Sequence, residues 1–261
     1  MDPDLFRIPI LTYHKITIRR ELGLNTIPPD LFESHMEILK VSGFSAVTFR
    51  DLREGNLPHR PVIITFDDGY SSVCEHALPI LKKFNFSAVI FIVTGYIGIK
   101  NTWDANLGGI TFTHLHSAQI KLLSESGMEI GSHGVTHRAF TLMKDWEVSA
   151  ELEESRQKIF KITGRYPQTI AYPFGMQNKK IRQTAIQKGY YYGCINMWGR
   201  SAPLEKMVLR RIPVYRTDHP AIFRMKFCSG WKNSMERTRL RIISFPALLT
   251  PVYQKYIKKM Y

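Results

Sequence analysis

Two adjacent carboxylates, Asp67 and Asp68, follow an apolar run that indicates a buried strand ending at Phe66. Burying two carboxylates at a strand end costs free energy unless they are paired or bind a metal. Adjacent strand residues point to opposite faces, but Gly69 would let the chain turn so that both carboxylates reach one pocket. One carboxylate could then bind a metal while the other acts as a base. Asp-Gly alone also occurs in ordinary turns.

Two histidines, His133 and His137, stand four residues apart after a second predicted strand at 128–131. One turn of chain can bring both imidazoles to one side, where they could bind the same ion. The spacing is weak evidence alone. Together with Asp67 and Asp68 it predicts an open catalytic metal site, in which two histidines, an aspartate and a water hold the ion. Zinc fits such ligands, as do other first-row ions.

A third strand end carries the sequence Tyr172-Pro173-Phe174-Gly175. A sharp turn at this point could direct a backbone N–H toward an oxyanion. An ordinary Pro-Gly turn is the alternative interpretation, and for this motif alone it is the more common one.

The elements that must position these residues alternate between strands and helices. We expect strands at 8–13, 44–49, 61–66, 88–93, 128–131, 169–172, 190–194 and 209–214. We expect helices at 31–42, 74–84, 117–125, 146–163 and 179–188. This alternation predicts an α/β fold with right-handed βαβ units and a parallel sheet. About seven repeats in about 215 residues favour a closed barrel, whose functional residues lie at the carboxyl ends of its strands.

The positive charge of the chain is concentrated at its C-terminal end. The 261 residues have a formal net charge of +14, of which +8 comes from nine basic residues and one acid in residues 219–261. We therefore divide the chain into a body, 1–218, and a basic, aromatic-rich helical extension, 219–261. Such an extension suits a membrane surface or an anionic partner, or it packs its apolar side on the body. No nucleic-acid-binding motif is recognisable, so nucleic acid is the least favoured partner.

Cysteine usage and hydropathy exclude several classes of protein. The three cysteines are widely spaced, which excludes a disulfide framework and a thiolate zinc site. The first residues show no secretory signal, and no apolar run approaches the roughly 20 residues that span a bilayer. We therefore expect a cytoplasmic protein that can contact the inner face of a membrane through residues 219–261.

The three strand-end motifs, in this order, resemble those of the polysaccharide deacetylase family, the NodB-homology domains of carbohydrate esterase family 4. The run from Thr65 to Gly69 matches the family's TFDDG motif without a change. The run from Ser132 to His137 matches its SHTxxH motif except at Gly134. The third motif is similar to R-x-P-Y-G, with Ala171 in place of the arginine.

The resemblance covers roughly residues 8–215 and implies a metal-dependent sugar N-deacetylase built on a distorted (β/α)7 barrel. It implies that Asp67 is the catalytic base and that the backbone N–H of Phe174 helps to stabilise the oxyanion. The implied ligands of a divalent metal, for which we expect Zn²⁺, are Asp68, His133 and His137. The substrate would be an N-acetylated glycan or a lipid-linked sugar.

Two departures from the family pattern leave roles open. The arginine of the third motif normally orients the base, and Ala171 leaves that task to another group. The candidates are Arg156, Arg210 and Arg211. The C-terminal motif whose histidine supplies the general acid is not evident, although His219 stands near the right place.

The N-terminal sequence ending in Tyr13-His14 resembles the opening motif of a branch that includes biofilm poly-N-acetylglucosamine deacetylases. In that branch the barrel is circularly permuted, and the first strand replaces the missing last one. The replacement is geometrically sensible because first and last strands are neighbours in a closed barrel. We therefore expect a permuted barrel with His14 as the general acid.

The histidines and tryptophans outside the motifs are weaker candidates for the functional site. His114 and His116 precede a predicted helix, and without a third ligand nearby we expect them to be surface loop residues. The loop sequences Trp103-Asp104 and Trp198 could supply a ring that stacks on a sugar, although loop packing is the commoner role.

Two other functions stay open at this stage. The chain could be a deformylase or another C–N hydrolase acting on a lipid-linked amino sugar. It could also be a glycan-binding module that kept the fold and lost catalysis, and Ala171 is the one feature that favours this reading.

Overall fold

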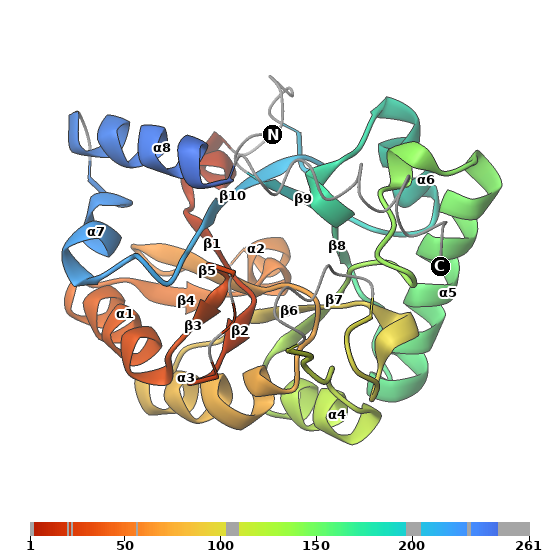
Figure 1. Cartoon of the computed structure of the whole chain (residues 1–261). Helices are drawn as coiled ribbons and strands as arrows, with labels where there is room; N and C mark the ends of the chain where they lie inside the picture. Colours follow the sequence, from red (N-terminus) through yellow and green to blue (C-terminus); the bar gives the residue numbers. More distant parts are fainter. Residues whose placement is uncertain are drawn as a thin grey trace.

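The fold is built on parallel strands that close into a barrel with helices around it (Figure 1). The computed structural model describes residues 3–19, 21, 23–55, 57–102, 110–196, 205–228 and 231–244. Among these residues, the main sheet consists of β1 (Ile10–Tyr13), β4 (Ser45–Val47), β5 (Pro61–Phe66), β6 (Val89–Ile92), β7 (Glu129–Ser132), β8 (Thr169–Ala171), β9 (Tyr192–Asn196) and β10 (Leu209–Pro213). A small second sheet pairs β2 (Lys15–Ile16) with β3 (Thr26–Ile27).

The barrel closes because β1 pairs in parallel with both β10 and β5. From β5 to β10 each strand pairs with the next in the chain, which gives a ring of seven strands. The short strand β4 lies outside this ring, along the first half of β5. The first strand therefore lies between β10 and β5, and the predicted seven-stranded barrel is confirmed.

The helices pack on the outside of the ring (Figure 1), except α2 (Phe49–Glu54), whose Phe49 is buried in one cluster with Ile63 and Phe91. They are α1 (Pro29–Val41), α2 (Phe49–Glu54), α3 (Leu78–Phe84), α4 (Ser117–Glu125), α5 (Asp145–Thr163), α6 (Lys179–Gln187), α7 (Pro220–Met225) and α8 (Trp231–Ser244). Shorter turns are the 3-10 segments η1 (Pro3–Arg7), η3 (Thr94–Tyr96), η4 (Phe140–Leu142) and η5 (Pro173–Gly175), and the π-helical η2 (Val73–Ala77).

The predicted strand at 44–49 is only partly correct, because the chain enters α2 directly after β4. Thr48 caps α2 by accepting a hydrogen bond from the backbone N–H of Asp51, whose carboxylate accepts one from the backbone of Thr48 in return. This reciprocal arrangement satisfies two backbone donors at the helix start. The capping residues Thr48 and Asp51, and not the apolar periodicity, therefore indicate that a helix begins here.

Alternation along the strands decides which side chains face the inside of the barrel. Ile63 and Phe91 belong to one buried cluster with Leu209, whereas Ile64 and Ile90 pack in another cluster with residues of the helices. Because both faces of the strands are buried, the strands are apolar throughout, as parallel strands usually are. Alternation along β5 therefore places the side chains of Thr65 and Asp67 on the inner face with Ile63. Along β10 it places Arg211 on the inner face with Leu209.

The described part of the extension packs against the body. Phe223 of α7 is fully buried and stacks on His35 of α1 with 4.0 Å between ring centroids. The buried ammonium of Lys226 lies 2.9 Å from Asp218 and 2.6 Å from Glu236 of α8. Ion pairs thus link residues on both sides of the predicted boundary at 218, and the division itself stays a prediction.

The predicted membrane contact of the extension also stays a prediction. Residues 245–261, which carry three of the nine basic residues of the extension, lie outside the described residues. Of the helices that the structure describes, none combines the length and the apolar character needed to cross a bilayer.

Candidate metal centre

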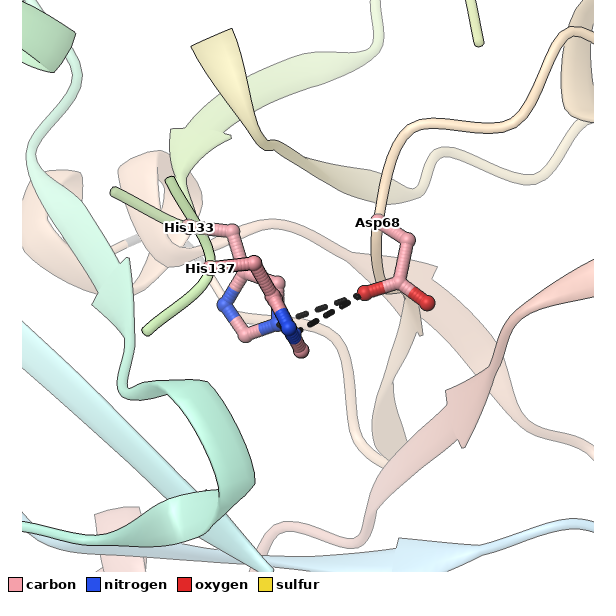
Figure 2. Close-up of side chains that lie close together, drawn as sticks. All are labelled: Asp68, His133 and His137. Atoms are coloured by element: carbon pink, nitrogen blue, oxygen red, sulfur yellow. Dashed lines mark hydrogen bonds and ion pairs between the residues drawn. The ribbon is translucent and has the colours of Figure 1, made fainter. Parts of the chain in front are cut away.

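Asp68, His133 and His137 come together at the carboxyl end of the barrel, where Figure 2 shows the two imidazoles facing one carboxylate oxygen. Asp68 follows β5, and both histidines follow from the end of β7. The Nε2 atoms of His133 and His137 lie 3.5 and 3.4 Å from Oδ1 of Asp68 and 3.2 Å from each other. All three side chains are buried. The structure thus groups the three residues that the resemblance implies as metal ligands.

The spacing of these three atoms fits a tetrahedral ion. Ligand atoms about 2.0–2.1 Å from zinc at tetrahedral angles are separated by about 3.3–3.4 Å. The observed 3.2–3.5 Å separations agree with this value. Two imidazole nitrogens and one carboxylate leave part of the coordination sphere for water or substrate, as in catalytic rather than structural sites. These donors suit zinc and also other first-row ions.

The imidazoles are held in the form that binds a metal. Nδ1 of His133 lies 2.6 Å from the carbonyl oxygen of Ala171, to which it can donate its proton, so that Nε2 presents a lone pair toward Asp68. Burial lowers the pKa of His133, against the opposing effect of Asp67. Burial also lowers the pKa of His137, and the neighbouring His133 acts in the same direction. Both rings are therefore neutral at neutral pH, as metal ligation requires.

Left-handed backbone conformations are concentrated in this site. Among the described residues, four residues other than glycine have positive φ angles, and three of them are Asp68, His137 and Phe174. Such conformations cost roughly 1–3 kcal/mol each and persist where the surrounding structure enforces them. At Gly69, φ is +71° and a Cβ atom would lie 2.9 Å from the side chain of Ile92, so glycine is required directly after the two carboxylates.

Helix α5 fixes the loop that carries the two histidines. The carboxylate of Glu151 is buried and accepts hydrogen bonds from the backbone N–H groups of Val135 (2.6 Å) and Thr136 (3.1 Å) and from the hydroxyl of Thr136 (2.5 Å). One helical turn later, the hydroxyl of Ser155 lies 2.6 Å from that of Ser132. Glu151 was not identified from the sequence, because its hydrogen-bond donors, two backbone N–H groups and one hydroxyl, belong to a separate segment that precedes its helix.

Asp67 forms a buried, bidentate ion pair with Arg211. Nη1 and Nη2 of Arg211 donate to Oδ1 and Oδ2 of Asp67 at 2.6 and 2.7 Å, and both side chains are buried. Nη2 also donates to the amide oxygen of Asn196 at 3.3 Å. Burial would raise the pKa of Asp67, but the charge of Arg211 and the hydrogen bonds from Arg211 hold that pKa well below its usual range.

The structure therefore selects Arg211 from the three arginines that the sequence left open. Arg156 lies on α5, with its guanidinium 4.0 Å from the ring centroid of Tyr166. Arg210 faces outward on β10. Ala171 is buried in the inner cluster with Phe91, and the guanidinium of Arg211 lies over the Phe91 ring at 5.4 Å. The arginine thus comes from β10 instead of from the third motif.

Of the two candidates for the general acid, His14 is the one beside the metal centre. It follows β1, and the charges of Asp67, Arg211 and His133 all act on its pKa. His219 instead is exposed at the start of α7 and lines a groove with residues of α1.

Phe174 also reaches the metal centre. It lies in η5 with φ of +58°, and its ring packs edge-on against His137 with 4.8 Å between centroids. The role of its backbone N–H stays a prediction. Trp103, Asp104 and Trp198 lie outside the described residues.

The interpretation of His114 as a surface loop residue is wrong. His114 is buried, stacks on Tyr70 with 4.9 Å between centroids, and contacts the carbonyl of Ile99 through Nδ1 at 3.0 Å. It is covered because residues 113–115 pair antiparallel with the segment after Gly69, a contact that no local pattern reveals. His116 is exposed, as expected, and caps α4 through its side chain.

The sequence of the chain matches a known protein family. A model of the polysaccharide deacetylase family matches residues 54–193, more than half of the chain. The chain belongs to the polysaccharide deacetylase family. Within this family, it is 29% identical over 192 residues to YxkH of Bacillus subtilis, covering 72% of this chain and 63% of that one. It is 26% identical over 189 residues to the poly-β-1,6-N-acetyl-D-glucosamine N-deacetylase of Staphylococcus aureus, covering 67% and 62%.

A solved structure of this family shows the same fold. The Streptococcus pyogenes deacetylase PplD in complex with acetate matches with a TM-score of 0.70 and 27% identity, over 82% of this chain and 95% of that one. The chain spans less than two thirds of the length of the two relatives from Bacillus subtilis and Staphylococcus aureus.

We predict that Glu151→Gln weakens metal binding by about 10–100-fold, the usual effect of losing a group that orients metal ligands. A glutamine has one acceptor oxygen and cannot replace both carboxylate oxygens that hold the loop between His133 and His137. Competition with a chromophoric chelator measures the affinity for Zn²⁺. Glu154→Gln, at an exposed position of the same helix, is the control and should leave the affinity unchanged. Equal affinities for both variants would contradict this role of Glu151.

Proposed function

We propose that this protein is a metal-dependent hydrolase that removes an N-acetyl group from an amino sugar in a glycan or a lipid-linked saccharide. The observation that carries the proposal is the juxtaposition of Asp67, held ionised by Arg211, with the group of Asp68, His133 and His137. A base and a metal site together are what hydrolysis of an unactivated amide requires. Family membership and the named activity of the Staphylococcus aureus relative support the choice of amide.

In the proposed reaction, Asp67 is the general base. A divalent ion held by Asp68, His133 and His137 would polarise the amide carbonyl and make a water molecule more acidic. Asp67 accepts a proton from the attacking water, and Arg211 orients the carboxylate through its two hydrogen bonds. The backbone N–H of Phe174 would donate a hydrogen bond to the developing oxyanion.

His14 would deliver the proton that the departing amine needs. Burial lowers the pKa of His14 to about 4, with Asp67 opposing this effect, so the imidazole is neutral at neutral pH. It must therefore take up a proton before it donates one, and the proton that Asp67 removes from water is the one the reaction supplies. As the C–N bond breaks, this proton makes the leaving nitrogen a neutral amine, and the water oxygen stays on the acyl carbon in acetic acid, which then loses the second water proton to give acetate.

The alternative of an inactive binding module loses the feature that favoured it. Ala171 removed the expected partner of the base, but Arg211 provides that partner from β10. Asp67 therefore keeps the charge and the orientation that a base needs.

The experiment that tests this proposal is a substrate panel. We expect the protein to release amine from N-acetylated glycans or lipid-linked N-acetyl sugars, to lose this activity with a chelator, and to regain it with Zn²⁺. Asp67→Asn should bind Zn²⁺ but lose about 10²–10⁴-fold in rate, the usual worth of a general base. Release from N-formylated sugars alone would identify a deformylase. Zinc binding without hydrolysis of any substrate would refute the hydrolase.

Replacing Arg211 should shift the pH dependence of the reaction. In Arg211→Met, burial of Asp67 is no longer opposed by the guanidinium, so the pKa of Asp67 rises and the base becomes protonated at higher pH. We therefore predict that the acid limb of the kcat/KM profile moves to higher pH and that activity at neutral pH falls by about 10²-fold through loss of orientation. Arg210→Met, the outward neighbour, is the control. An unchanged acid limb in Arg211→Met would show that Arg211 does not set the pKa of the base.

A further inference from the structure

A buried lysine directly follows His14, the proton donor of the proposed reaction. Lys15 is the first residue of β2, and only 5% of its side chain is exposed. Lysine is rarely buried unless its charge is paired. The ammonium of Lys15 lies 2.6 Å from one carboxylate oxygen of Glu21 and 2.8 Å from the other. Neither residue belongs to the metal centre, so this buried ion pair has another role.

Two aromatic rings complete the surroundings of the Lys15 ammonium. Its Nζ lies 4.9 Å from the ring centroid of Tyr70 and 4.5 Å from that of Phe112. An aromatic face attracts a cation, and the attraction is stronger where water is excluded. Tyr70 comes two residues after Asp68, and Phe112 belongs to the segment before α4. Lys15 therefore joins the segment after β1 to two other segments at the carboxyl end of the barrel.

The Tyr70 ring that receives the ammonium is itself held in place. It stacks on His114 with 4.9 Å between centroids, and its hydroxyl accepts a hydrogen bond from the side-chain amide of Asn101 at 2.9 Å. Burial lowers the pKa of His114 to about 4, against the hydrogen bond to the carbonyl of Ile99, and the charge of Lys15 acts in the same direction as burial. His114 is therefore neutral at neutral pH and adds no positive charge beside the ammonium.

The backbone on both sides of His14 is attached to the segment that carries the base. The N–H of Asp67 donates to the carbonyl of Tyr13 at 2.9 Å, and the N–H of Ile16 donates to the hydroxyl of Ser72 at 3.3 Å. The imidazole has less support, because its Nδ1 is buried and forms no hydrogen bond with any residue that the structure describes. Its orientation therefore depends on the backbone conformation at His14, which decides the allowed rotamers.

We propose that Lys15 is a positioning residue for His14. Its side chain anchors the chain directly after His14 to the ring of Tyr70, and so fixes the backbone that carries the imidazole. Because adjacent residues of an extended chain point to opposite sides, Lys15 held among the rings leaves His14 directed to the other side, toward the metal centre. Glu21 neutralises the ammonium and keeps it buried. The inference rests on the proposed function, because it takes His14 as the proton donor.

Substrates with different leaving groups test this role. A β-1,6-linked N-acetylglucosamine oligomer releases an amine that needs a proton, whereas para-nitrophenyl acetate releases a phenolate that needs none. In zinc-loaded Lys15→Met, we expect kcat for the oligomer to fall by about 10–100-fold through misplacement of the proton donor, while hydrolysis of the ester keeps its wild-type rate. A merely structural role would lower both rates. Lys100→Met, at an exposed position before the Phe112 segment, is the control and should change neither rate.

A double variant separates positioning from the effect of an uncompensated charge. Lys15→Met leaves Glu21 without its cation, whereas Lys15→Met combined with Glu21→Gln removes both charges. We expect the same loss of amide hydrolysis, with the ester rate retained, in the single and the double variant. The proposal would be overturned by a wild-type amide rate in either variant or by equal losses for amide and ester.

A measurement without turnover separates this inference from the proposed function. If the zinc-loaded wild type does not hydrolyse the oligomer, NMR spectra of protein labelled in its histidine rings decide the matter, with the His14 signal identified by its loss in His14→Gln. A His14 signal that is broadened or split in Lys15→Met, and unchanged in Lys100→Met, would keep Lys15 as the residue that orients His14 while the hydrolytic proposal falls. The same sharp signal in wild type and Lys15→Met would overturn the positioning role as well.

Discussion

Inside the closed barrel, Asp67 keeps its charge because Arg211 donates two hydrogen bonds to it from a strand on the other side of β1. Removing one partner of such a buried pair typically costs about 3–5 kcal/mol, because an uncompensated charge remains. The pair therefore constrains both the fold and the chemistry. It requires β1 to lie between β5 and β10, and this closure is also what places His14 beside the metal centre.

The metal centre depends on a second constraint, which is the shape of the loops at the strand ends. Asp68 and His137 both have left-handed backbone conformations, and such conformations persist only where neighbouring groups enforce them. Glu151 and Ser155 of α5 enforce them for the loop after β7, and Gly69 permits the close approach of β6 after β5. Helix α5, outside the barrel, thus positions the loop that carries the two histidines through hydrogen bonds.

The contrast between Asp67 and Arg211 shows how far the sequence could predict this site. Asp67, Asp68, His133 and His137 were identified because each pair is local and follows an apolar strand. Arg211 was only one of three candidates, since its partner is far away in the sequence and the pairing depends on strand register. One signal could have selected it: alternation from Leu209 places Arg211 on the inner face and Arg210 on the outer face. His114 was misjudged because its burial arises from pairing with residues 69–71.

The central claim is that Asp68, His133 and His137 bind one metal ion, and X-ray absorption at the zinc edge of the zinc-loaded protein tests it most directly. We predict one zinc per chain with two imidazole nitrogens and at least one carboxylate oxygen at about 2.0–2.2 Å, and loss of this zinc in His133→Ala. A spectrum without imidazole scattering, or equal zinc binding by a folded His133→Ala variant, would contradict the account.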